Sequence, residues 1–199
     1  MIHSNRGQKY PAEPLTQDEA RVIFNACSKR APTGIRNRAL LVVLYRGGLR
    51  ISEALSVLPK DLDAEAGTIR VLRGKGKKAR LVGLDAGAWA VLQVWLERRS
   101  QMRISARVPL FCTLQGEPMK TAYVRAMLPR LARKAGIQRR VHPHAFRHSF
   151  AFELVNERTP LHVVQAALGH ASIATTDRYI RHLNPKAVVE AMRSREWSL

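Results

Sequence analysis

Acidic residues are scarce in this chain. It has 15 Asp and Glu residues against 34 Lys and Arg residues, which gives a formal net charge of +19 over 199 residues. A globular protein this basic usually binds a polyanion, and nucleic acid is the first candidate. Charge alone leaves two alternatives open, which are a solvated basic surface and a ribosome-associated protein.

Cysteines and long apolar runs are also scarce. The two cysteines, Cys27 and Cys112, lie at no metal-ligand spacing, so we expect reduced thiols in a cytosolic protein. No apolar run approaches the roughly 20 residues that a membrane span requires. The N-terminus lacks the apolar stretch of a signal peptide. We therefore expect a cytoplasmic, nucleoid-associated protein with no membrane partner.

The chain has neither internal repeats nor low-complexity tracts. Hydrophobic residues make up 46% of it, which excludes a disordered chain, and its length suits one domain with a real core. Residues 1–14 hold Pro11 and Pro14 but little apolar pattern, so we expect a flexible arm. Residues 15–199 are then expected to form one domain.

Local signals predict that this domain is mainly helical. Thr16 and Glu19 have the spacing of a capping box, which predicts a helix to about Lys29. Residues 31–34 should break that helix, and a second helix should run over 36–46 until Gly47-Gly48 ends it. A short helix is predicted to start near Ser52. Later helices are predicted over about 86–100, 120–135, 143–157, 160–168, 172–181 and 184–193. Gly136 is expected to end the helix over 120–135, and Pro143 is expected in the first turn of the helix over 143–157.

The spacing of apolar residues changes from helical to strand-like in one stretch of the chain. Residues 68–72 and 79–84 resemble strands, and the glycine- and lysine-rich residues 74–78 between them resemble a hairpin turn. The predicted fold class is therefore mainly α with a small antiparallel β-sheet.

The last third of the chain concentrates groups that can act on a phosphodiester. His144 and Arg147 are three apart near the start of a predicted helix, where free N–H groups favour an anion. The guanidinium of arginine can grip two phosphate oxygens. Tyr179 follows His170 by nine residues, and cationic neighbours would stabilise its phenolate. This pattern indicates covalent chemistry on DNA through a tyrosine.

Simpler interpretations of these residues remain. A lone histidine or tyrosine is more often a packed, hydrogen-bonded residue than a catalyst. His144 and His148 have the spacing of a zinc pair, but Ala145 stands where the zincin motif requires Glu, and a third ligand is missing nearby. The glycines and lysines of 74–78 lack the spacing of a phosphate loop. We therefore expect neither a metal nor a nucleotide site.

Four blocks of sequence together resemble a known family. Residues 48–55 read GLRISEAL, residues 74–76 read GKG, residues 142–151 read HPHAFRHSFA, and residues 168–179 read LGHASIATTDRY. In this order and spacing the chain resembles the tyrosine recombinases of the phage integrase family, nearest to the Xer-type and fimbrial-switch branches. The resemblance covers about residues 14–190 and implies the DNA breaking-rejoining catalytic fold of that family.

The resemblance implies a role for each matching residue. The implied catalytic residues are Arg50, Lys75, His144, Arg147, His170 and Tyr179. The two arginines would clamp the phosphate, with His170 as a further donor. His144 would handle the proton of the nucleophile Tyr179, and Lys75 would protonate the leaving 5′ oxygen. Lys77 and Lys78 are alternatives to Lys75 for this role. Glu53 would support Arg50, although an exposed glutamate that only helps its helix is an alternative.

The implied reaction is a transesterification through a 3′-phosphotyrosyl link. Because the covalent link conserves the phosphodiester energy and the cationic side chains supply the charge, we expect no metal, ATP or other cofactor. The expected partners are double-stranded DNA and further copies of the chain in a DNA-bound tetramer, with an accessory DNA-binding protein as an open alternative. The residues expected to bind DNA are Arg73, Lys77, Lys78, Arg80, Arg139 and Arg140.

The chain departs from the family pattern in two places. The pattern begins near residue 14, so the N-terminal DNA-binding domain of most members is expected to be absent. A single-domain enzyme, a fragment and a partner-dependent protein are three explanations. Arg158 stands where the family usually has glycine, which would cost about 1 kcal/mol if the residue is left-handed. Two other functions stay open: a non-catalytic DNA-binding accessory protein and a type IB topoisomerase-like enzyme.

Overall fold

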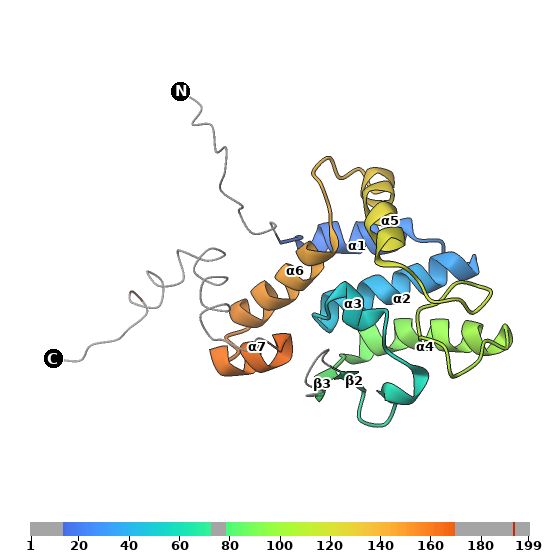
Figure 1. Ribbon diagram of the computed structural model, residues 1–199. Helices are drawn as coiled ribbons and strands as arrows, with labels where there is room; N and C mark the ends of the chain where they lie inside the picture. Colours follow the sequence, from blue (N-terminus) through green and yellow to red (C-terminus); the bar gives the residue numbers. More distant parts are fainter. Residues whose placement is uncertain (1–13, 73–78, 170–192, 194–199) are drawn as a thin grey trace.

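The structure is a computed structural model that describes residues 14–72, 79–169 and 193. It is mainly helical with a small antiparallel sheet, as predicted (Figure 1). Its elements are α1 (Gln17–Ala26), α2 (Pro32–Arg46), α3 (Ile51–Ala54), the 3-10 turn η1 (Pro59–Asp61), β1 (Leu62–Asp63), β2 (Thr68–Leu72), β3 (Ala79–Gly83), α4 (Ala86–Gln101), α5 (Thr121–Lys134), α6 (Pro143–Asn156) and α7 (Leu161–Leu168). Within the described residues, none of the helices combines the length and apolar character that a membrane crossing needs.

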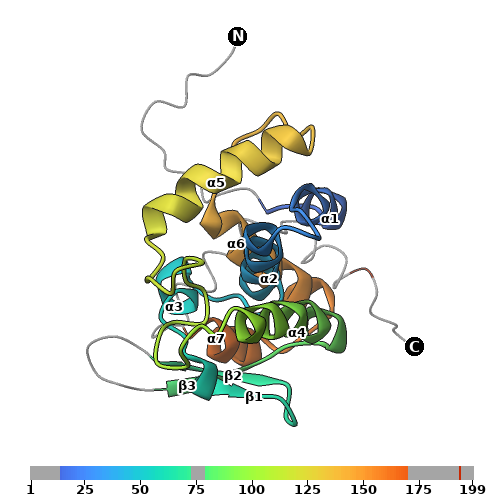
Figure 2. The ribbon, with the colours of Figure 1, turned by 90° about the vertical axis from the view of Figure 1, so that its right-hand side faces the viewer.

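Helix α2 is the centre of the fold. Figure 2 looks almost along it and shows α1, α5, α6 and α4 arranged around it. Buried residues occur on nearly every side of α2, among them Leu40, Leu41 and Leu44, which are all 0% exposed. A helix that is apolar all round is stable only inside a core. Because α3 and Arg50 directly follow α2, the core fixes where the site begins.

The sheet has the order β1-β2-β3 with antiparallel pairing throughout. Ile69 of β2 pairs with Val82 of β3, and both are buried beneath the helices, while Leu81 points to solvent. The two predicted strands are confirmed. The third strand, β1, was not predicted, because its two residues are too short to show a period of two.

The start of α1 agrees with the prediction, but its end does not. The Thr16 hydroxyl accepts from the Glu19 N–H, and the Glu19 carboxylate accepts from the Thr16 N–H, which confirms the capping box. The predicted end at about Lys29 is wrong, because Cys27 is already extended. The Ser28 hydroxyl then accepts from the Arg30 and Ala31 N–H groups and turns the chain.

The predicted break at residues 31–34 is also wrong in part, because α2 already begins at Pro32. Proline is well suited to a first helical position, where its missing N–H costs nothing. Gly34 lies against the neighbouring turn, and a Cβ there would be 2.4 Å from the Ser28 carbonyl oxygen. Here glycine permits a close approach and does not end a helix.

Helices α5 and α6 are both followed by a residue with a positive φ, but the residue type differs. Gly136, just after α5, has a φ of 77°, the left-handed conformation in which glycine often ends a helix, and it ends α5 as predicted. Arg158, between α6 and α7, has a φ of 58°, so an arginine occupies a left-handed position. The arm predicted over residues 1–14 lies outside the described residues except for Pro14, and the helices predicted over 172–181 and 184–193 lie outside them except for Arg193.

Candidate active site

Arg50 begins the site at the N-cap of α3. The preceding turn needs Gly48, because its φ is 60° and a Cβ there would lie 2.2 Å from a ring carbon of Phe150 in α6. This close approach brings the segment 48–50 against α6. The Arg50 side chain remains 39% exposed, so its guanidinium is accessible to a ligand from solvent.

Glu53 is a buried carboxylate with four hydrogen bonds. Arg50 donates to it through its backbone N–H at 2.9 Å and through Nη1 at 2.9 Å. Arg80 donates to Oε1 at 3.0 Å and to Oε2 at 2.8 Å. Although burial alone would raise the pKa of Glu53, these bonds and the two cations lower it from 4.5 to about 2. Glu53 is therefore ionised and lies between two arginines.

Arg147 is the second arginine of the site, and it is only 5% exposed. It lies in the second turn of α6, and its Nη1 donates to the Gly48 carbonyl at 2.5 Å. Its Nη2 donates to the carbonyl of Leu168 at the end of α7. Arg147 thus joins the segment before Arg50, helix α6 and the end of α7, which are far apart in sequence.

His144 lies in the first turn of α6, one turn before Arg147. Partial burial lowers the pKa of His144, and so do the charges of Arg147, Arg50 and Arg125. A neutral imidazole at pH 7 can accept a proton from a nearby phenol. The ring of His148 lies 6.5 Å from that of His144. Burial, and then the neighbouring histidines and Arg147, lower the pKa of His148 to about 4.

The structure brings together three of the six predicted catalytic residues, Arg50, His144 and Arg147. The other three, Lys75, His170 and Tyr179, lie outside the described residues, as do the predicted DNA contacts Arg73, Lys77 and Lys78. Among the described residues, no group of three or more His, Cys, Asp or Glu side chains is placed to hold a metal ion.

Comparison with known proteins gives the family. The sequence pattern of the phage integrase family matches residues 13–186. The chain belongs to this family. A tyrosine recombinase XerC of Thermodesulfovibrio yellowstonii is 36% identical over 181 residues, which are 88% of this chain and 60% of that protein. This integrase-family chain thus spans about three fifths of the length of that relative.

Two solved structures agree with the family assignment. XerA recombinase superposes with a TM-score of 0.82 at 31% identity, over 96% of this integrase-family chain and 68% of XerA. XerH, in a post-cleavage complex with palindromic difH DNA, superposes with a TM-score of 0.78 at 31% identity, over 96% of this chain and 55% of XerH. The fold is therefore that of tyrosine recombinase catalytic domains.

The predicted DNA-contact residues of this integrase-family chain differ in their surroundings. Arg139 donates to both carboxylate oxygens of Glu19 and to the Pro14 carbonyl, and 29% of its side chain is exposed. Arg140 is exposed. Arg80 is engaged with Glu53 and is only 11% exposed. Only Arg140 of these three presents a largely open side chain.

The sequence did not single out Arg125 of α5. It is exposed, and its charge acts on His144, so it adds a cation to the same face. No local pattern marks it, because α5 carries other basic residues and only packing decides which of them faces α6.

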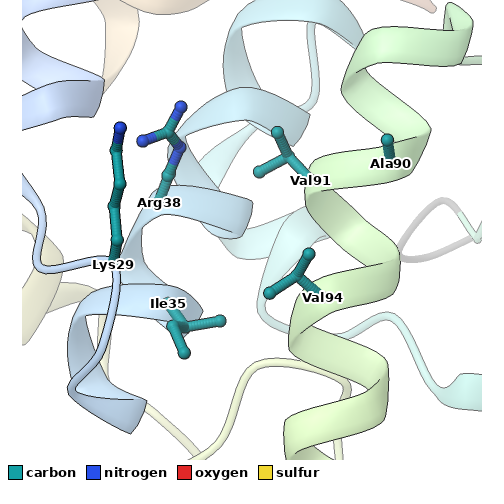
Figure 3. A pocket seen from close by; sticks show the side chains of 6 residues that line it. All are labelled: Lys29, Ile35, Arg38, Ala90, Val91 and Val94. Atoms are coloured by element: carbon teal, nitrogen blue, oxygen red, sulfur yellow. The ribbon is translucent and has the colours of Figure 1, made fainter.

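A separate hollow of about 350 Å³ lies between α2 and α4 (Figure 3). Val91 and Val94 point from α4 toward Ile35 of α2, with Lys29 and Arg38 at the rim. Ile35 and Arg38 belong to the N-terminal half of α2, whereas Arg50 follows its C-terminal end. The hollow has no acid or nucleophile in its lining, so we place the chemistry at the arginine site.

Proposed function

We propose that this chain is the catalytic domain, residues 15–199, of a site-specific DNA recombinase that cleaves and rejoins DNA through a 3′-phosphotyrosyl intermediate at Tyr179. One observation carries the proposal. Arg147 donates to the Gly48 carbonyl, two residues before Arg50, and His144 lies one turn before Arg147 on α6, so two guanidinium groups and one imidazole come together from separate elements. This arrangement suits a phosphate that is under attack.

The proposed reaction is two successive transesterifications. The Tyr179 oxygen attacks the scissile phosphorus, and His144 takes the phenol proton. The bond from phosphorus to the 5′ oxygen breaks, and Lys75 protonates the leaving oxygen. Arg50, Arg147 and His170 bind the non-bridging oxygens, where negative charge grows. A 5′-hydroxyl of a second strand then attacks the phosphotyrosyl link and releases Tyr179.

The relatives support DNA as the partner. XerH was solved bound to its DNA substrate after cleavage. The net charge of +19 would favour binding of this chain to phosphates. We propose that four copies assemble on two DNA duplexes, and that residues 184–199 contact a neighbouring copy.

The proposed assembly has a direct test. Deletion of residues 184–199 is expected to weaken formation of the multi-copy complex on DNA more than binding of one copy to one site. Gel shifts over a range of protein concentrations separate these two complexes. Unchanged multi-copy assembly by the truncated chain would contradict the proposed role of this segment.

Recombination itself is tested with a supercoiled plasmid that carries two directly repeated copies of the DNA flanking the gene. Strand exchange is expected to yield two smaller circles, which restriction digestion identifies. Relaxation without preference for that DNA, and without smaller circles, would favour a topoisomerase. Binding without any change of topology would favour an accessory DNA-binding protein.

A further inference from the structure

Arg80 joins three elements that surround the site. It projects from β3, and its Nη1 and Nη2 bond the two carboxylate oxygens of Glu53 in α3 at 3.0 and 2.8 Å. Its Nε donates to the Ala167 carbonyl near the end of α7 at 3.1 Å. Only 11% of its side chain is exposed, so little of the guanidinium is left for a ligand.

The bond pattern requires an arginine. A planar guanidinium can meet both oxygens of one carboxylate and still direct a third N–H elsewhere. A lysine ammonium at the same place would reach only part of this set. Together with the two bonds from Arg50, the bonds from Arg80 bring Glu53 to four, which matches the capacity of a carboxylate.

The end of α7 is held by two arginines of the site. Arg80 donates to the carbonyl of Ala167, and Arg147 donates to that of Leu168. Cations at the C-terminal end of a helix satisfy its free carbonyls and its dipole. These carbonyls come directly before Gly169 and His170 in sequence, so both arginines fix where the predicted catalytic segment begins.

The charges explain what the loss of Arg80 would do. Arg50, Glu53 and Arg80 together carry one net positive charge. Without Arg80, the buried Glu53 carboxylate would be left to Arg50 alone, and the pair would be neutral. Arg50 would then be held more tightly to Glu53 and would be less able to follow the negative charge that grows on the phosphate during attack.

We infer that Arg80 is a positioning residue for strand cleavage, which orients Arg50 through Glu53 and fixes the end of α7, and that it does not contact the DNA backbone. This inference rests on the proposed function. It also reassigns a residue that the sequence placed among the DNA contacts. Two different readouts, cleavage rate and salt-dependent binding, separate the two roles.

The experiment compares wild type with Arg80→Ala and Arg80→Lys on a nicked duplex that traps the covalent product. At saturating protein, Arg80→Ala is expected to cleave on the order of 100-fold more slowly, as for a misplaced catalytic group. Its Kd and the salt dependence of its binding are expected to match wild type. Arg80→Lys keeps the charge but loses the two-oxygen grip, so we expect it to recover only part of the rate.

A double variant tests the link to Glu53. If Arg80 acts through this carboxylate, Arg80→Ala combined with Glu53→Gln should lose far less than the product of the two single losses. Arg21→Ala is the matched control, because Arg21 forms an exposed ion pair with Asp18 on α1, away from the site. Thermal melts of all variants at pH 7 show which of them are folded.

Three results would overturn the inference. Folded Arg80→Ala and Arg80→Lys variants that cleave at the wild-type rate would show that positioning is unnecessary. Weaker binding with a salt slope reduced by about 0.9, and normal cleavage at saturation, would make Arg80 a phosphate contact. A wild type that binds DNA but cleaves none would remove the reaction itself and would count against the proposed function as well.

Discussion

At the scale of single residues, the site is defined by which cations are already paired. Arg80 donates to Glu53 and to a backbone carbonyl, and Arg147 donates to two backbone carbonyls. Arg50 instead has an exposed guanidinium with a single side-chain bond to Glu53. The exposed guanidinium of Arg50 can adjust to an incoming phosphate, whereas its two backbone bonds hold Arg147 in one position. We therefore expect Arg50 to adapt to the phosphate and Arg147 to bind it from a fixed position.

Glu53 gives the first prediction at this scale. Its pKa is about 2 instead of 4.5, so its ionised form stabilises the fold fully above about pH 4.5 and loses that contribution as the pH falls toward 2. At about 1.4 kcal/mol for each pH unit, the contribution is about 3 kcal/mol. Glu53→Gln should therefore be less stable than wild type at pH 7.

Urea unfolding of both proteins at several pH values checks this prediction. The difference in free energy of unfolding should shrink steadily between pH 4.5 and 2. Glu97→Gln, at an exposed position of α4, is the matched control for the exchange of a carboxylate for an amide. A difference in free energy of unfolding between wild type and Glu53→Gln that stays constant down to pH 2 would contradict the assigned ionisation.

The residue scale is also where sequence reasoning stopped short. The spacing of His144 and Arg147 predicted a shared face, because both lie within one turn of a helix. The bonds of Arg80 with Glu53 and the influence of the Arg125 charge on His144 could not be predicted. They relate β3 to α3 and α5 to α6, which are far apart in sequence. Local patterns carry no signal for such contacts.

At the scale of elements, the helix ends decide how the site is held. The capping box at Thr16 and the left-handed glycine at 136 were predictable, because each depends on a few neighbouring residues. The predicted end of α1 and start of α2 are wrong, because Pro32 and Gly34 lie in the first turn of α2 and do not break a helix. Their actual effect depends on Ser28, which packs against the first turn of α2.

The left-handed Arg158 gives a prediction at this scale. Its φ of 58° is strained for a residue with a side chain, so Arg158→Gly should stabilise the protein by up to about 1 kcal/mol. The gain is reduced by the chain entropy that glycine adds to the unfolded state. Urea unfolding at pH 7 measures the change.

Two control variants show how large the stability change of Arg158→Gly should be. Gly136→Ala should destabilise by about 1 kcal/mol through the backbone alone, because its φ is 77° and a Cβ there meets nothing within 4 Å. Arg133→Gly, inside α5, should also cost about 1 kcal/mol. If Arg158→Gly destabilises as much as Arg133→Gly does, the left-handed turn after α6 carries no strain.

At the scale of the whole molecule, the positive charge is divided between structure and binding. Arg36 is 3% exposed and bonds the Cys112 carbonyl, Asn37 and Tyr123. Arg99 is 5% exposed and donates to the carbonyls of Ile104, Ser105 and Val108. These arginines stabilise the fold. The net charge therefore overstates the number of phosphate contacts that the chain can make.

The exposed cations Arg125 and Arg140, whose charges act on His144 and His142 at the start of α6, give the prediction at this scale. Arg125→Ala and Arg140→Ala should each weaken DNA binding and reduce the slope of log K against log salt by about 0.9. Arg107→Ala, in the loop beyond the far end of α4, should leave this slope unchanged. Fluorescence anisotropy with a short duplex at several salt concentrations measures the slopes. Equal slopes for all four proteins would place the DNA on another face.

The central claim is that the arginine site serves a tyrosine nucleophile. Wild type and Tyr179→Phe are incubated with an end-labelled, nicked duplex bearing the DNA that flanks the gene, and the products are separated on a denaturing gel. The account predicts a covalent protein–DNA adduct in wild type, mapped to Tyr179 by proteolysis, and none in the variant. An adduct that persists in Tyr179→Phe, or its absence from wild type that binds the duplex, would contradict it.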